Sequence, residues 1–296
     1  MLTIDPTQIA TRDLHQFILG AVSPRPIAFA STISTDGVPN IAPYSFFNAF
    51  SSNPPILIFS SNRRVANNTT KDTLKNVQDT GEVVINVVPH SIVRQMAMAS
   101  IEWSSEVNEF EKTGLTPLAS DLVKPFRIAE SPVQMECKVD QVLPLGDDGG
   151  AGNLIVCRIV RMHIAEEVLN ENGRIDPHKI DLMGRMGRFW YVRASGNALE
   201  EIVQEVGAVD VIGFDKLPYG IRHSSVLTGN NIARLAALKA LPSAEESAAL
   251  AIANTRVQAL LKAPDARVAI HRYAQEVLEN GDVELGAKLV VLGGNL

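Results

Sequence analysis

Lys71, Asp72 and Thr73 form a short polar block whose residue types could bind an anion. The apolar spacing of residues 70–80 predicts a helix that ends at Gly81, so the block falls at the helix N-terminus. Free backbone N–H groups and the positive end of the helix dipole attract anions there, while Lys71 adds charge and Thr73 a hydroxyl. An ordinary capped surface helix would show the same residues, so the motif alone leaves both interpretations open.

Polar and aromatic side chains alternate over Ser45, Phe46, Phe47 and Asn48. In a strand, Ser45 and Phe47 would share one face and Phe46 and Asn48 the other, so neither face is uniformly apolar. This mixed pattern suits the edge of a cofactor, and Asn48 can donate and accept hydrogen bonds at once. A barrel strand with a hydrogen-bonded core asparagine is the alternative interpretation.

Arg25 lies between Pro24 and Pro26, which fix an extended backbone and aim the arginine with little entropy lost on binding. An ordinary surface charge is the alternative. Ser60 and Ser61 end another predicted strand and could reach ligand oxygens, although serines in that position usually form turns.

An antiparallel meander must position these residues. The apolar run at 26–33, the Asp36–Gly37 turn and a second strand open it. The glycines of residues 146–152 predict a hairpin tip rather than a phosphate-binding loop, because no lysine or helix start follows them. Further strands are predicted at 56–60, 83–88, 133–143 and 154–164, and further helical segments at 6–19, 92–100 and 107–112.

The pattern changes to helix after residue 196, which predicts two domains, 1–195 and 196–296. Ser243 with Glu246 forms a capping box, and Asp265 is a predicted N-cap. Helical spacing covers residues 197–207, 229–242, 243–263 and 265–281. The joining segment, 212–231, carries more apolar residues than a linker needs, so we expect a partial lid over the first domain. Burial of these residues against the helices is the alternative.

Composition excludes several classes of protein. The chain has 296 residues, 46% of them hydrophobic, and a net charge of −6 without a basic stripe, so we expect no nucleic-acid partner. Cys137 and Cys157 lie in apolar runs and are predicted to be reduced core residues. The 6 histidines lack metal-ligand spacing, and no G-x-S-x-G motif supports hydrolysis. Neither a signal peptide nor a membrane span is visible, so a cytoplasmic location is expected.

Several separated segments together resemble the flavin reductase-like FMN-binding split-barrel family, the flavoredoxin and short-chain flavin reductase group. They are PRPIAFASTISTDGVPNIAPYSFFNAFSSNPPILIFSS from residue 24, the Lys71 block, SSEVNEFEKTGLTP at 104–117 and DLMGRMGRFWYVR at 181–193. The resemblance covers about residues 5–195. It implies a mainly β fold with α: a six-stranded antiparallel Greek-key barrel with flanking helices, here followed by a helical C-terminal domain.

The resemblance also implies which residues bind FMN. Lys71, Asp72 and Thr73 would lie at the phosphate, and Asn48 suits the alternating donors and acceptors of the flavin pyrimidine. Arg185 would contact the flavin from the far edge of the pocket or from a second subunit, or else be a surface charge. The remaining predicted cofactor-binding residues are Arg25 near the flavin, Ser45, Phe46 and Phe47 along the ring, and Ser60 and Ser61 at the ribityl or phosphate oxygens.

The function that the resemblance implies is that of an NAD(P)H-dependent flavin reductase. The protein would be a homodimer with FMN at each edge of the subunit interface, and FAD is a possible replacement for FMN. It would supply reduced flavin to a partner monooxygenase. No catalytic side chain is predicted, because hydride transfer to a flavin leaves the protein mainly to position the reactants. A flavoredoxin-like electron carrier that does not reduce free flavin is the alternative.

Overall fold

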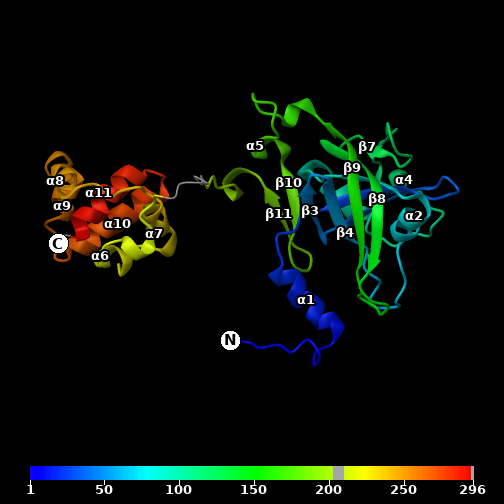
Figure 1. Ribbon diagram of the computed structural model, residues 1–296, viewed down its shortest axis with the longest axis horizontal. Helices are drawn as coiled ribbons and strands as arrows, with labels where there is room; N and C mark the ends of the chain where they lie inside the picture. The colour runs from blue at the N-terminus through cyan, green and yellow to red at the C-terminus, as the bar shows by residue number, and fades with distance from the viewer. Residues whose placement is uncertain (203–209, 295–296) are drawn as a thin grey trace. The chain divides into compact units, whose positions relative to one another are not determined.

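The structure is a computed structural model that describes residues 1–202 and 210–294 (Figure 1). Its contacts divide the chain into two compact units, Met1–Glu201 and Ile202–Leu296. We call the first the barrel unit and the second the helical unit. None of the helices in the described ranges is both long and apolar enough to cross a membrane.

An antiparallel sheet dominates the barrel unit. Over the described residues it has seven strands in the order β2-β1-β5-β8-β9-β4-β3. The strands are β1 (Ala28–Ile33), β2 (Pro39–Tyr44), β3 (Phe47–Ser52), β4 (Pro55–Ser60), β5 (Glu82–Asn86), β8 (Val133–Pro144) and β9 (Asn153–Ile164). The Asp36–Gly37 turn joins β1 to β2 as predicted, with Gly37 at a φ of 85° that glycine adopts without steric cost.

The sheet has one strand more than the six expected, because residues 39–52 form two strands instead of one. Ser45 and Phe46 separate β2 from β3, and these two strands lie at opposite ends of the sheet order. So short a link spans roughly 10 Å at most, whereas six inter-strand gaps in a flat sheet would span roughly 29 Å. The sheet must therefore curl until its first and last strands approach each other, which makes a barrel.

Two hydrophobic clusters fill the barrel unit. One contains the barrel interior, including Phe59 and Ile155, and it also buries both cysteines, Cys137 and Cys157, as free thiols. The other packs Phe29 and Ile41 against the short helices outside the sheet. The predicted reduced core cysteines are confirmed.

Short elements surround the sheet. Helix α2 ends at Gly81, which has a φ of 68° and caps the helix as predicted. The helices are α1 (Thr11–Ala21), α2 (Asp72–Thr80), α3 (Val93–Met98), α4 (Glu109–Thr113) and α5 (Pro177–Ile180). Two small hairpins complete the unit: β6 (Pro117–Leu118) with β7 (Arg127–Ile128), and β10 (Leu182–Arg185) with β11 (Tyr191–Ala194).

The helical unit has its own apolar core, which includes Leu235 and Ile270. Its helices are α6 (Tyr219–Arg222), α7 (Gly229–Ala236), α8 (Ala244–Ala253), α9 (Thr255–Leu260), α10 (Ala266–Glu279) and α11 (Val283–Gly294). The capping box of Ser243 with Glu246 and the N-cap at Asp265 are both confirmed. Helix α11 was missed, because glycines interrupt its apolar run at both ends.

One expectation for the start of this unit needs correction, and another is met in part. Of the helix predicted at 197–207, residues 196–198 form only a single 3-10 turn and 199–202 are not helical, while 203–209 lie outside the described residues. Of the apolar residues that suggested a lid, Leu217 and Ile221 are buried in the core of the helical unit. Val226 is half-buried, whereas Phe214 and Tyr219 are exposed. Burial against the helices, the alternative interpretation, accounts for the first two, and the lid stays a prediction.

Candidate functional site

A small polar cavity of about 90 Å³ lies at the N-terminus of α2. We call it the α2 pocket. It combines two cationic side chains with polar groups from β2, α2, the loop before α2 and the segment after α3. The lining residues are Asn40, Ala42, Arg64, Lys71, Asp72, Thr73, Ala99, Ser100, Ile101, Glu102, Trp103 and Glu109.

The start of α2 differs from that of an ordinary capped helix. Lys71 occupies the N-cap position, and in the described residues no side chain caps the helix. Serine, threonine, aspartate and asparagine are the usual N-cap residues, since their oxygens accept from the first free amides. An uncapped N-terminus beside a lysine leaves those donors available to an anion. This geometry favours the anion-site interpretation of the block.

Lys71 is largely buried. Its Nζ lies 4.9 Å from the centre of the Tyr44 ring, a cation–π contact. Burial lowers the pKa of Lys71 and the nearby Arg64 lowers it further, whereas Glu102 opposes the shift. A dianion in the pocket would relieve both unfavourable effects, because it compensates the charge that burial and Arg64 disfavour.

Arg64 is a second cation in this pocket and was missed from the sequence. Its Nη1 donates to Thr69 Oγ1 at 2.9 Å and to the Thr70 carbonyl at 2.6 Å, and its Nε lies 3.0 Å from Glu102 Oε1. These contacts hold the guanidinium at the pocket. The adjacent arginines at 63 and 64, a few residues before the Lys71 block, were the signal that could have identified it.

Buried polar atoms without partners lie beside the pocket. Within the described residues, Tyr44 Oη, Ser61 Oγ and Trp103 Nε1 are buried without a hydrogen bond of regular geometry, although Thr73 and Ser61 lie close enough to the Tyr44 hydroxyl to interact with it. Thr73 and Ser61 are polar neighbours of Tyr44, and burial raises the pKa of Tyr44 to about 12, so its hydroxyl stays protonated at neutral pH. Unpaired buried polar groups are costly and uncommon in folded proteins. We interpret them as groups to which a ligand would add a partner.

Thr73 belongs to a buried polar network beneath the pocket. Its Oγ1 accepts from Asn40 Nδ2 at 2.9 Å, and Asn40 Nδ2 also donates to Thr32 Oγ1 at 2.9 Å. Asn76 on α2 donates to the same Thr32 oxygen at 3.1 Å. The network fixes α2 against β1 and β2, so the helix N-terminus is held in place before any ligand binds.

The predicted residues Ser45 to Asn48 occupy the link from β2 into β3. The Phe46 carbonyl accepts from the Ser60 amide at 2.8 Å, which ties this link to β4. Phe47 packs on the barrel core, whereas Asn48 is exposed and its Oδ1 accepts from the Ala49 amide at 2.8 Å. These residues follow directly after Tyr44, which contacts Lys71 beside the pocket, and β3 continues as an exposed edge strand.

Arg25 and Arg185 lie together, away from the lining of the α2 pocket. Their backbones pair through two hydrogen bonds, of 2.9 and 2.8 Å. Arg25 is buried and donates to the Leu19, Val22 and Met186 carbonyls and to Ser45 Oγ. Arg185 lies over the Tyr191 ring at 4.5 Å and donates to the Arg188 carbonyl. Arg25 thus anchors the end of α1, and of the two arginines it is the one linked to Ser45.

The structure therefore separates the predicted site residues into two groups. Lys71, Asp72 and Thr73 line the α2 pocket, and Ser61 presents one of the unpaired hydroxyls beside it. Ser60 is buried, and its Oγ donates to Asn62 Oδ1 at 2.7 Å. The second group follows the β2–β3 link and comprises Arg25, Ser45, Phe46, Phe47, Asn48 and Arg185.

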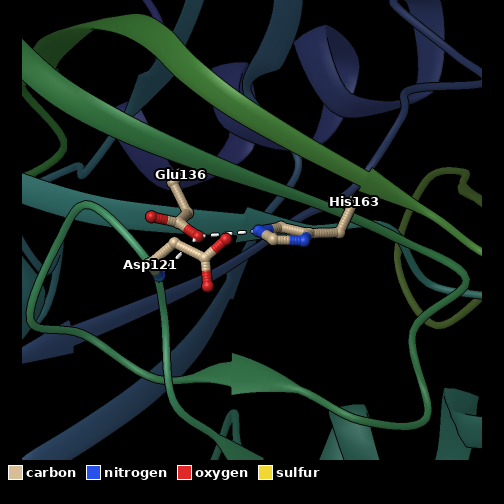
Figure 2. A group of neighbouring side chains, drawn as sticks. All are labelled: Asp121, Glu136 and His163. Atoms are coloured by element: carbon tan, nitrogen blue, oxygen red, sulfur yellow. Dashed lines mark hydrogen bonds and ion pairs between the residues drawn. The ribbon is translucent and has the colours of Figure 1, made fainter.

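A separate cluster joins Asp121, Glu136 and His163, whose ligand-type atoms lie within 4.8 Å of one another in the described part of the chain (Figure 2). Sequence spacing could not show this, because β8 and β9 bring Glu136 and His163 together. Glu136 Oε1 accepts from the Asp121 amide at 2.9 Å and lies 2.7 Å from His163 Nε2, and Oε2 accepts from the Leu122 amide at 2.6 Å. We interpret the cluster as a structural brace, because its carboxylates are already paired.

Comparison with known proteins identifies the family. The flavin reductase like domain matches residues 20–179, more than half of the chain. The chain belongs to the flavin reductase-like family. The matched span includes the whole α2 pocket and the β2–β3 link, so both groups of predicted residues other than Arg185 fall inside it.

Three proteins show how far the likeness extends. An Aquifex aeolicus protein of uncharacterised function is 43% identical over 183 residues, 62% of this chain and 91% of the relative. Nitrilotriacetate monooxygenase component B from Bacillus cereus has 30% identity and a TM-score of 0.63, covering 69% of this chain and 98% of that one. A Shewanella frigidimarina protein described as a flavin reductase with a split barrel domain has 22% identity and a TM-score of 0.57, covering 69% and 100%. The expected fold, a split barrel with C-terminal helices, is confirmed.

Proposed function

We propose that this protein is an FMN-binding, NAD(P)H-dependent flavin reductase that supplies reduced flavin to a partner monooxygenase. The observation that carries the proposal is the α2 pocket, an uncapped helix N-terminus with Lys71 and Arg64 beside it. Membership of the flavin reductase-like family supports the same assignment. The buried free thiols Cys137 and Cys157 suit the cytoplasmic location that we propose for it.

The pocket fits one end of FMN. Its volume of about 90 Å³ suits a phosphate group, whereas ligand pockets that enclose a whole drug-sized molecule usually measure about 300–1,000 Å³. Lys71 and Arg64 supply the charge that balances a phosphate dianion, and the free α2 amides supply donors. Tyr44 and Ser61 would donate from their buried positions to ribityl or phosphate oxygens.

The ring would lie along the β2–β3 link, next to Phe46, Phe47 and Asn48. Strand β3 is an exposed sheet edge, and Phe50 on it is 63% exposed. Exposed edge strands with large apolar side chains are uncommon in soluble proteins unless another chain covers them. This supports a homodimer in which each flavin lies at an edge of the subunit interface.

The residues of this chain bind and position the reactants. Bound FMN would supply the hydride-accepting ring, which is the chemistry that flavins bring to oxidoreductases. Lys71 and Arg64 would hold the phosphate, and the β2–β3 link would contact the ring. The Arg25 bond to Ser45 Oγ at 3.4 Å ties that link to α1 and to the β10 strand.

The partner is proposed from one relative. Nitrilotriacetate monooxygenase component B is by its name one part of a monooxygenase, and it aligns with this chain at 30% identity. A reductase that releases its product needs an acceptor, and an oxygenase component consumes reduced flavin. The organic substrate of that oxygenase is a separate question from the site described here.

Two measurements test the proposal. The purified protein should bind FMN in a titration and should oxidise NADH or NADPH rapidly when free FMN is added. A protein that keeps FMN tightly but does not consume nicotinamide with free flavin is instead a flavoredoxin-like carrier. A protein that binds no flavin contradicts both functions.

A further inference from the structure

The outer wall of the α2 pocket is the segment of residues 99–103, and Glu102 is its charged member. The Glu102 side chain is 63% exposed and the Arg64 side chain 24%, so the carboxylate lies on the solvent side of this ion pair. Arg64 also donates hydrogen bonds to Thr69 Oγ1 and to the Thr70 carbonyl. The guanidinium therefore stays at the pocket, with Glu102 on its outer side.

The carboxylates of the pocket are not equivalent. Asp72 Oδ1 accepts from Ser105 Oγ at 2.7 Å, and Glu109 is only 8% exposed, with its Oε2 3.4 Å from the Ile41 amide. Both carboxylates are thus held by neighbouring groups. Glu102 is the lining acid whose side chain is mostly in solvent, where a ligand that extends out of the pocket would meet it.

A terminal phosphate and a diphosphate would meet this wall differently. A single phosphate matches the size of the cavity and the two cations, Lys71 and Arg64. The second phosphate of a dinucleotide would have to extend from a cavity of about 90 Å³ whose lining includes Glu102, and so it would lie near that carboxylate. Like charges placed together reduce affinity, and such repulsion is a common source of specificity.

We propose that Glu102 is a specificity-determining residue that admits the terminal phosphate of FMN and rejects the diphosphate of FAD. The inference rests on the proposed function, because it concerns the flavin at that same site. Specificity here comes from a repulsive group beside an attractive pair, and it acts on the phosphate end without touching the ring.

The test compares Glu102→Gln with Glu106→Gln in the full chain. Glu106 is an exposed acid of the same loop that does not line the pocket, so its variant removes the same charge nearby. Dissociation constants are measured for FMN, FAD and riboflavin by flavin fluorescence at fixed ionic strength. We expect the unmodified protein to prefer FMN over FAD at least tenfold. In E102Q this preference should fall about five- to tenfold, chiefly through tighter FAD binding.

The remaining variants keep the outcome decisive. E106Q should retain the original preference, Glu102→Asp should restore it, and riboflavin affinity should stay unchanged in all three, which also shows that the variants are folded. Equal affinity for FMN and FAD in the unmodified protein would overturn the inference. An equal proportional change in the FMN and FAD affinities of E102Q would also overturn it, because Glu102 would then merely compete with either flavin for Arg64. Failure of all three flavins to bind would instead refute the proposed function.

Discussion

At the scale of single residues, we propose that Lys71 sets how tightly the phosphate end of FMN is held. Lys71→Ala should weaken FMN binding by about 1.5–3 kcal/mol, the range for hydrogen bonds to charged groups. Riboflavin lacks the phosphate, so its affinity should barely change. Titration of both ligands against both proteins measures this difference. An equal loss for FMN and riboflavin would remove Lys71 from the phosphate site.

The same lysine predicts a pH dependence. Burial lowers the pKa of Lys71 in the free protein, so its positive charge is lost at a lower pH than that of an exposed lysine. The charged form binds phosphate, and therefore the preference for FMN over riboflavin should decline as the pH rises toward this lowered pKa. Titrations from neutral to alkaline pH follow the ratio of the two affinities. In Lys71→Ala this alkaline decline should be absent.

Glu136 is the residue on which the brace around His163 depends. Burial by itself would raise its pKa, but hydrogen bonds from Asp121, His163 and Leu122 lower it below the ordinary value of 4.5. A carboxylate with a lowered folded-state pKa stabilises the fold above about pH 4.5 and loses this effect as the pH falls through the lower value.

Glu136→Gln should therefore lower the free energy of unfolding at pH 7 by about 1–3 kcal/mol, since its amide cannot accept all of these hydrogen bonds. It should also flatten the acid side of the stability curve. Urea unfolding at several pH values measures both effects. Glu171→Gln, at an exposed turn position, is the matched control. Equal stability of the two variants would show that the brace contributes nothing.

At the scale of elements, α2 depends on the residues that cap its two ends. Gly81 at the C-terminus has a φ of 68°, and a Cβ added there would meet nothing within 4 Å. Gly81→Ala should destabilise the barrel unit by about 1–2 kcal/mol, which is the cost of a left-handed conformation for a residue with a side chain. Thermal unfolding followed by circular dichroism checks this.

Gly20→Ala in α1 is the control for that experiment. Gly20 also has open space around an added Cβ, but its φ is not positive, so alanine should leave stability unchanged or raise it slightly. If both substitutions had the same effect, the conformation at Gly81 would not be the cause.

At the scale of the whole molecule, we expect flavin affinity to depend on assembly. A flavin held at a subunit edge contacts two chains and so binds the dimer better than the monomer. Diluting the protein should release FMN at the concentration at which the dimer dissociates. Mass measurements and flavin fluorescence over the same dilution series compare the two transitions. A monomer that keeps stoichiometric FMN would contradict the interface location.

The separate cores of the two units predict that residues 1–201 fold alone. Leu217, Ile221 and Leu227 of the joining segment lie in the core of the helical unit, and the barrel unit has apolar clusters of its own. This fragment should remain folded and bind FMN with a dissociation constant within about twofold of the full chain. A large change in affinity or in nicotinamide kinetics would restore the lid hypothesis.

The sequence by itself determined the elements whose signals are local. The Asp36–Gly37 turn, the end of α2 at Gly81, the capping box at Ser243 and the strand pair β8–β9 each depend on neighbouring residues, and each was predicted near its observed position. The Lys71 block was recognised for the same reason. The proposed anion site depends first on a helix start and a lysine, and both are readable along the chain.

Only the tertiary structure decided which distant residues share a site. Arg64, Tyr44 and Trp103 meet Lys71 because the barrel curls and α2 packs on it, and no spacing in the sequence encodes that approach. The division of residues 39–52 into two strands at opposite sheet ends was hidden for the same reason. Glu136 and His163 likewise meet only through pairing of β8 with β9. Sequence periodicity reports the face on which a residue lies, whereas long-range packing determines the groups that it meets there.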